Sequence, residues 1–162
     1  MIEKIKAGNY DMDLNDKMGK IDSLNLIDVN TYLGEFPYPS YSLDGKKFTD
    51  AIFYILQHSD TENMGKFIDQ LEKRAFAEEA SKKHYAMMKD RILMENKQNQ
   101  IYGTQLAPRK NAQGFITDDY FVWTLQNPQN VDSLRKEMGF TSTVAEYAKS
   151  NQAEYHPNEQ IK

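Results

Sequence analysis

The segment from His84 to Met94 constrains the fold most, because apolar side chains occur on nearly every side of the helix that it would form. A helix that is apolar all round is buried, so this segment predicts a central helix with other elements packed around it. Asp90 and Arg91 lie in its middle, where an unpaired buried charge costs several kcal/mol. As sequence neighbours they cannot face each other on a helix. Each is therefore expected to have a dedicated partner on another element.

Three amphipathic stretches precede the central helix, after a polar stretch that predicts a loose lead-in or a short helix. The first begins at Ile21 and ends before the run from Phe36 to Pro39, which predicts an ordered loop because proline interrupts helices. Ser59 and Glu62 fit a capping box at the start of the third stretch. The predicted apolar faces contain, in order, Leu26, Val29 and Leu33; Phe48, Ala51, Ile52 and Ile55; and Met64, Phe67, Ile68, Leu71 and Ala75.

After Asn96 the pattern changes to one typical of strands. A strand is predicted over Gln100–Leu106, followed by a turn-rich stretch and a returning strand over Tyr120–Leu125. A two-stranded hairpin is only marginally stable alone, so one of its faces must pack on the helices. Alternation makes Phe121, Trp123 and Leu125 the inward set.

The remaining sequence predicts a short helix, a last helical turn over Val144–Ala148 and a polar tail. Val131, Leu134 and Met138 form the apolar side of the short helix, and Gly139 fits a left-handed cap. The predicted organisation is a polar lead-in over 1–20, a single globular domain over 21–150 and a tail over 151–162. The expected fold is mainly α with one β-hairpin, namely a compact bundle of about five to six helices with the hairpin packed on it.

Composition and charge exclude several classes of protein. A formal net charge of -4 at pH 7 argues against a nucleic-acid surface, and the basic pairs Lys82-Lys83 and Arg109-Lys110 are interpreted as solvated positions. The absence of cysteine excludes disulfides and thiolate chemistry. No apolar run approaches the roughly 20 residues that cross a bilayer, and Met1–Tyr10 lacks the apolar centre of a signal peptide. We therefore expect a soluble chain, cytoplasmic by default, without a cofactor.

Three polar clusters could carry chemistry, although glycine-rich phosphate loops, zincin helices, nucleophile elbows and calcium loops are absent. These clusters are Gln57-His58-Ser59-Asp60, Asp90-Arg91 and Gln100-x-Tyr102-Gly103-Thr104-Gln105. Together they resemble the pattern of a bacterial family catalogued as domain of unknown function 6624, over roughly residues 21–150. The stretches Asp22-Ser23-Leu24-Asn25, as a helix start, and Tyr38-Pro39 also match, as do Arg135 and Glu146-Tyr147-Ala148. The first 20 residues lack a clean version of the additional N-terminal helix that relatives carry. The resemblance implies a fold and a polar centre, but no activity.

One interpretation joins the clusters in a ligand pocket. His58 would be an acid or base, Asp60 or Asp90 would orient it, and Arg91 would bind an anionic group. The ligand would also contact Gln57 from the first cluster and four residues from the third: Gln100, Tyr102, Thr104 and Gln105. A metal site of His58, Asp60 and His84 has no diagnostic spacing, so no metal is expected.

The other interpretation is structural. His58 would bond a backbone group, Asp60 would cap the next helix, and Asp90 with Arg91 would clamp the hairpin to the helices. The first hypothesis for function is accordingly a small binding module of the immunity or accessory type, with a protein partner or a small polar ligand. The alternative is a hydrolase-like or ligand-processing enzyme using His58. The sequence has no identifiable nucleophile, which would favour the enzyme, and predicts no large exposed apolar patch, which would favour the binding module. It therefore does not decide between the two hypotheses.

Overall fold

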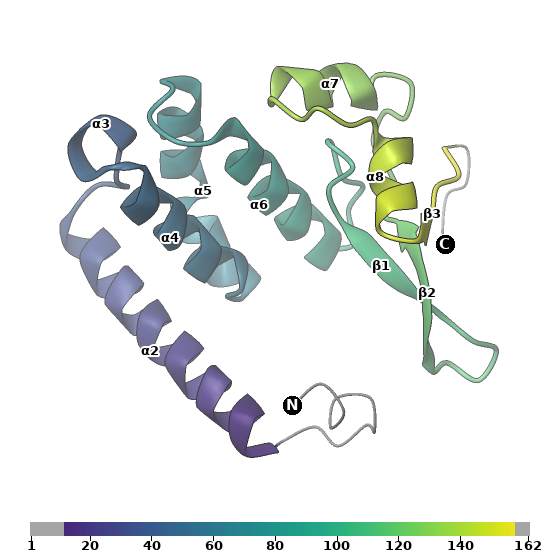
Figure 1. Cartoon of the computed structure of the whole chain (residues 1–162), viewed down its shortest axis with the longest axis horizontal. Coiled ribbons are helices and arrows are strands. Elements are labelled where there is room, and N and C mark those ends of the chain that lie inside the picture. Colours follow the sequence, from purple (N-terminus) through teal and green to yellow (C-terminus); the bar gives the residue numbers. More distant parts are fainter. Residues whose placement is uncertain (1–11, 158–162) are drawn as a thin grey trace.

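The structure is a computed structural model that describes residues 12–157, with side chains from residue 16. Helices make up most of the described part, and a small sheet packs at one end of them (Figure 1). This arrangement confirms the predicted mainly α fold with a small β component. The elements are α2 (Met12–Glu35), α3 (Tyr41–Asp44), α4 (Lys46–Gln57), α5 (Thr61–Phe76), α6 (Lys82–Glu95), β1 (Leu106–Lys110), β2 (Ile116–Val122), α7 (Val131–Glu137), α8 (Val144–Ser150) and β3 (Ala153–Glu154).

Helix α6 occupies the central position that its sequence predicts. It lies between α4 and α5 on one side and the sheet on the other (Figure 1). Helices α4 and α6 run in the same direction, and α5 runs in the opposite direction behind them and packs mainly against α6 (Figure 1). The main apolar core is shared by these helices and α2, and it contains Val29, Leu33, Phe53, Leu56, Met64, Leu71, Ala86 and Met88.

Helix α2 starts earlier than expected. It begins at Met12 and continues without a break to Glu35, so Asp22–Asn25 lies within the helix and does not start it. The helix contains no proline, and Gly19, the glycine in its interior, costs only about 1 kcal/mol in a long run of helix-forming residues. The end before Pro37 is as predicted, and the following loop is ordered. Gln70 of α5 accepts from the Tyr38 amide, and Arg74 donates to the Tyr38 carbonyl.

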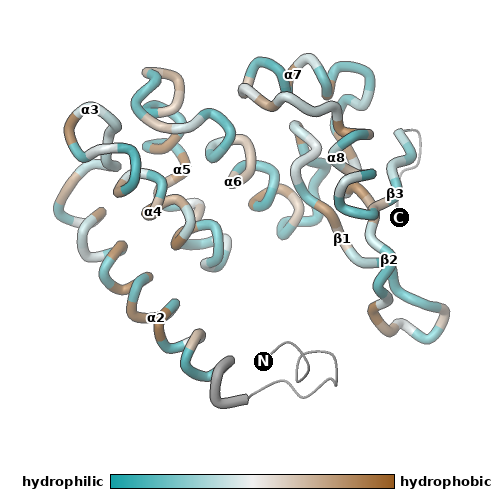
Figure 2. The backbone as a smooth tube through the Cα atoms, viewed as in Figure 1, coloured by the Kyte–Doolittle hydropathy of each residue, from teal (hydrophilic) through white to brown (hydrophobic). Residues whose placement is uncertain are grey.

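The N-terminal half of α2 exposes apolar side chains that the sequence interpretation did not anticipate. Met18, Ile21, Leu24 and Ile27 are all more than half exposed. Figure 2 shows hydrophobic segments along α2 as well as along the packed helices. Within residues 12–157, no helix combines the length and the apolar content that a membrane span requires.

The predicted apolar face of α4 is wrong in detail. Phe48 is 42% exposed and Ala51 is exposed, whereas the buried face contains Thr49, Ile52, Phe53 and Leu56. Both sets satisfy spacings of three and four residues, so periodicity alone does not decide between them. The predicted face of α5 is confirmed throughout.

Asp60, and not Ser59, caps α5. Its Oδ1 accepts from the Asn63 amide at 2.8 Å. The Ser59 hydroxyl instead donates to the Leu56 carbonyl, and Glu62 pairs with Lys66. The predicted capping box is therefore wrong, because the serine hydroxyl is used to end α4 instead.

The sheet has three strands in the order β1-β2-β3, where two were expected. β1 and β2 are antiparallel, with Leu106 opposite Val122, and β3 lies parallel to β2. The first strand therefore begins where the prediction had it end. Residues 153–154 pair with β2 although the sequence from Asn151 predicts no strand. Of the three residues predicted to face inward, Phe121 and Leu125 are buried, whereas Trp123 is only half-buried.

Helices α7 and α8 cover the sheet and form a second, smaller apolar cluster with it. Its buried residues are Val122, Leu125, Val131, Val144 and Ala148. Gly139 has φ of 86°, which confirms the predicted left-handed position after α7. A capping box of Thr143 and Glu146 starts α8.

Candidate functional site

Asp90 is fully buried on α6 and accepts hydrogen bonds from the loop that precedes β1. Its Oδ1 accepts from the amides of Ile101 at 2.8 Å and Tyr102 at 3.1 Å. Its Oδ2 accepts from the Tyr102 amide at 3.1 Å and from the amide and hydroxyl of Thr104 at 3.0 and 2.9 Å. The expected dedicated partner of Asp90 is thus a stretch of backbone, and both carboxylate oxygens are occupied.

Arg135 of α7 holds the same loop from the other side. It is 1% exposed, and its Nη1 donates to the carbonyls of Tyr102 at 3.0 Å and Gly103 at 3.1 Å. Its Nε donates to the Ser142 carbonyl at 2.9 Å. The peptide group between Gly103 and Thr104 therefore points its N–H at the carboxylate of Asp90 and its C=O at the guanidinium of Arg135. One peptide dipole stabilises both buried charges, and neighbouring peptide groups bond one or the other.

Two glutamines complete this network. Gln100 is fully buried, and its amide nitrogen donates to the carbonyls of Gln105 and Trp123. Its Oε1 accepts from the Gln105 amide at 2.9 Å. The Gln105 side chain donates to the Met87 carbonyl of α6 and to the Thr104 hydroxyl. We call the residues Asp90, Gln100, Thr104, Gln105 and Arg135 the polar clamp.

The electrostatics of the polar clamp follow from its burial. Removal from water raises the pKa of Asp90, and the hydrogen bonds from Ile101, Tyr102 and Thr104 oppose that rise. Removal from water likewise lowers the pKa of Arg135. The clamp thus holds two buried charges that remain fully hydrogen-bonded through the loop between them.

His58 lies outside the polar clamp. It is exposed at the end of α4, and Asp60 is exposed at the start of α5. The Asn63 amide lowers the pKa of Asp60, as expected for a helix cap. The structure therefore brings Asp90, Gln100, Thr104 and Gln105 together, but it places His58 and Asp60 at a separate, solvent-facing corner.

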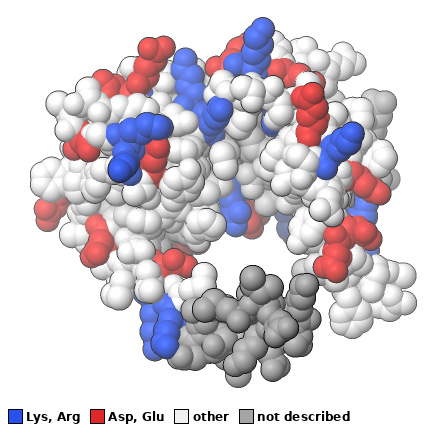
Figure 3. All heavy atoms as spheres, in the orientation of Figure 1, with Lys and Arg blue, Asp and Glu red and all other residues white. Residues whose placement is uncertain are grey.

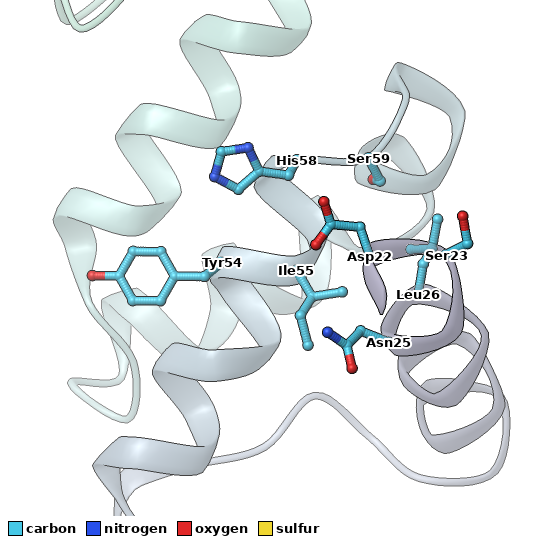
Figure 4. Close-up of a pocket in the computed structure, with 8 residues that line it drawn as sticks. All are labelled: Asp22, Ser23, Asn25, Leu26, Tyr54, Ile55, His58 and Ser59. Carbon is cyan, nitrogen blue, oxygen red and sulfur yellow. The ribbon is translucent and has the colours of Figure 1, made fainter. Parts of the chain in front are cut away.

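His58 borders a groove between α2 and the end of α4, with a cavity volume of about 310 Å³. Figure 4 shows the Asp22 carboxylate and the Asn25 amide extending from α2 toward α4, with Asp22 entering the space between His58 and Ile55. The lining residues are Asp22, Ser23, Asn25, Leu26, Tyr54, Ile55, His58 and Ser59. We call this the His58 groove. Its polar groups Asp22, Asn25 and His58 form no side-chain hydrogen bond with other described residues.

Gln57 and Arg91 differ from the residues of the polar clamp because each has a buried polar atom without a hydrogen-bond partner in the described part of the chain. The Oε1 of Gln57 and the Nε of Arg91 are buried and have no hydrogen-bond partner among residues 12–157. The expectation of a dedicated partner for Arg91 is therefore wrong within the described chain. The remaining candidate, Tyr102, is 7% exposed and meets the Tyr85 ring edge to face.

The sequence matches the family described as a family of unknown function, DUF6624, over residues 2–156. The chain belongs to this family. The match extends on both sides of the 21–150 range inferred from motifs, and it includes the start of α2. No match was found among curated proteins or among solved structures.

The motifs that suggested the family fall into two structural groups. The Gln-x-Tyr-Gly-Thr-Gln motif and Asp90 form the polar clamp, together with Arg135. The Gln-His-x-Asp motif and Asp22–Asn25 meet at the His58 groove. Sequence reasoning noted Arg135 and Asp22 only as matches to the family, without a role. The one available signal for Arg135 is a charge directly beside the apolar positions Leu134 and Met138.

Two broader features of the surface bear on possible ligands. In the described residues, no three His, Asp or Glu side chains gather closely enough to hold a metal ion, so His58, Asp60 and His84 do not form such a group. Basic and acidic side chains are interspersed over the face seen in Figure 3, without a broad patch of either sign.

Proposed function

We propose that this protein is a small binding module in which the polar clamp fixes the sheet to the helices and the His58 groove binds a small polar ligand. The observation that carries the proposal is the difference between the two polar groups. The hydrogen-bonding atoms of the clamp are buried and paired with one another, whereas those of His58, Asp22 and Asn25 are available at a concave surface. A ligand needs unpaired donors and acceptors, so the groove is the better binding site.

The size of the groove favours a small molecule over a protein segment. Its volume of about 310 Å³ lies at the lower end of the range of roughly 300–1,000 Å³ for small-molecule sites. The lining combines the apolar side chains Leu26 and Ile55 with the polar groups of Asp22, Asn25 and His58. A ligand with a small apolar body and several hydroxyl or amino groups fits this lining.

An enzymatic function is the second candidate, and one observation favours it. The Asp22 carboxylate extends into the space beside the His58 side chain (Figure 4). A carboxylate beside an imidazole can orient it as a general acid or base. In that case a ligand bound in the groove would be converted, and not merely held.

The test compares His58→Ala with Asp90→Ala. A panel of sugars, amino acids, nucleosides and their phosphates is added to ¹⁵N-labelled protein, and the amide resonances of Asn25, His58 and Ser59 are followed. We expect at least one compound to shift these resonances in the wild type and in the control His156→Ala, but not in His58→Ala. Appearance of a new compound in the mixture, dependent on His58, would favour the enzyme.

Stability provides the second readout. Asp90→Ala leaves the amides of Ile101, Tyr102 and Thr104 without their acceptor and removes the buried negative charge that balances Arg135, so it should cost about 3–5 kcal/mol of unfolding free energy in urea. His58→Ala should change that free energy by no more than about 0.5 kcal/mol. The proposal is contradicted if no compound affects the groove, or if the two substitutions destabilise the protein equally.

A further inference from the structure

Two buried polar atoms have no hydrogen-bond partner among the described residues, one in Gln57 at the end of α4 and one in Arg91 on α6. Gln57 is only 7% exposed, and its Oε1 has no hydrogen-bond partner among the described residues. The half-buried Arg91 has neither an ion pair nor a hydrogen bond with any described residue, and its Nε is buried. A buried N–H without an acceptor is unfavourable, so the position beside the Arg91 Nε favours an anionic acceptor.

The contact between Asp50 and His84 shows which faces of α4 and α6 meet. Their Oδ1 and Nδ1 atoms are 3.4 Å apart, and the His84 ring stacks on Phe53 at 3.9 Å between centroids. Gln57 and Arg91 each lie seven residues further along, which returns each to the same helix face within about 20°. Because α4 and α6 run in the same direction (Figure 1), this register would place Gln57 opposite Arg91, roughly 10 Å beyond the Asp50–His84 contact.

The direction of the Arg91 side chain connects this position with the His58 groove. Side chains on a helix lean toward its N-terminus, so Arg91 covers the turn of α6 that precedes it. That turn is level with the end of α4, where His58 is exposed. On this register the Arg91 guanidinium and the Gln57 amide would lie toward the C-terminal end of α4, next to the His58 groove, which they would extend because neither is among its lining residues.

We propose that Arg91 and Gln57 form an anion-binding subsite of the His58 groove, a proposal that rests on the function proposed above. Arg91 would donate two N–H groups to a carboxylate or phosphate, which matches its planar geometry. The Oε1 of Gln57 would accept from a hydroxyl or amino group next to that anion. The ligand class is a small molecule that combines an anionic oxygen group with an adjacent hydrogen-bond donor.

Four probes separate the two features of that class. Glycerol 3-phosphate and lactate carry an anion beside a hydroxyl, whereas inorganic phosphate and acetate carry the anion alone. Each is titrated into the folded protein while the Arg91 Nε–Hε resonance and the His58 amide are followed, with sodium chloride at matched ionic strength as the reference. We expect saturable shifts with at least one hydroxylated probe, and weaker binding of its counterpart without the hydroxyl. The phosphate and carboxylate arms identify the anion.

Variants assign the binding to these residues. Arg91→Gln should weaken binding of the hydroxylated probe by roughly tenfold or more. Gln57→Ala should remove the preference for the hydroxylated probe. Lys89→Gln on the same helix is the matched charge control and should change binding less than about twofold. Arg91→Lys, which keeps the charge but not the planar fork, should bind more weakly than the wild type while its thermal unfolding reports that it is folded.

The inference is overturned if none of the four probes gives a saturable shift, or if Lys89→Gln weakens binding as much as Arg91→Gln. A panel compound that shifts the groove amides of Asn25 and Ser59 with equal affinity in wild type and Arg91→Gln would also overturn it. That last result would leave the proposed binding function in place, so the two failures are distinguishable.

Discussion

At the residue scale, the loop before β1 is shaped by two buried charges of opposite sign. Asp90 accepts from amides of this loop and Arg135 donates to its carbonyls, so the peptide group between Gly103 and Thr104 is oriented across the space between them. The Tyr147 hydroxyl donates to the Thr104 carbonyl and continues the same pattern. Burial of this irregular loop is therefore compensated by hydrogen bonds from its backbone to buried side chains.

Gly103 permits this loop conformation in two ways. It has φ of 65°, and a Cβ at this position would lie 2.7 Å from Cγ2 of Val144. Gly114 has φ of 85° but open space around it, so it provides a matched control.

We predict that Gly114→Ala costs about 1–2 kcal/mol of unfolding free energy from backbone strain alone. Gly103→Ala should cost at least about 1 kcal/mol more, because its methyl group also overpacks the core. Urea unfolding of the two variants measures the difference. Equal costs would show that close packing against Val144 contributes nothing.

How much of the site the sequence predicts depends on the residue. The need of Asp90 for a partner follows from its place on an apolar helix, and the structure confirms it. The identity of that partner does not follow, because backbone amides carry no sequence signal. Arg91 shows the same limit, since its position predicted a partner that the described chain does not supply.

At the element scale, prediction succeeded where only one face satisfies the apolar pattern. The α5 stripe fits one face and is correct, whereas α4 offers two overlapping faces and the wrong one was preferred. The segment Gln100–Gln105 has strand-like residues but no strand, because its amides bind Asp90 and the side chain of Gln100 in place of a neighbouring strand.

The interface of α4 and α6 should make stability depend on pH. Burial lowers the pKa of His84, and the negative charge of Asp50 opposes this effect, whereas the positive charges of Lys46 and Lys83 add to it. The unfolded histidine has a pKa of about 6.5, so below that value the unfolded chain binds more protons than the folded one. Stability should therefore fall as the pH drops from about 6.5 through the lower pKa of the folded protein.

The measurement is the free energy of unfolding in urea at about pH 7.5 and about pH 5.5. We expect the wild type to lose up to about 1.4 kcal/mol per pH unit within this window, and His84→Asn to lose less. His156→Asn, at an exposed histidine, should keep the dependence of the wild type. An unchanged dependence in His84→Asn would contradict the role of His84.

At the scale of the whole molecule, the polar clamp lies between two apolar clusters. One cluster is formed mainly by the helices α2, α4, α5 and α6, and the other by the sheet with α7 and α8. Helix α7 contacts both, because Leu134 and the following Met138 pack on the first cluster and Val131 on the second. Asp90 belongs to the first group of elements and Arg135 to the second, and the loop is hydrogen-bonded to both. The clamp therefore couples the two parts of the fold, while the His58 groove lies apart from the seam.

Native-state hydrogen exchange tests this account most directly, because it needs no substitution. The amides of Ile101, Tyr102, Thr104 and Gln105 belong to a loop, yet each donates to a buried side chain of the clamp. We predict that they exchange only through global unfolding, as slowly as the amides in the middle of α6. Exchange as fast as that of the exposed turn around Gly114 would show that the loop opens independently, and that the clamp does not hold the molecule together.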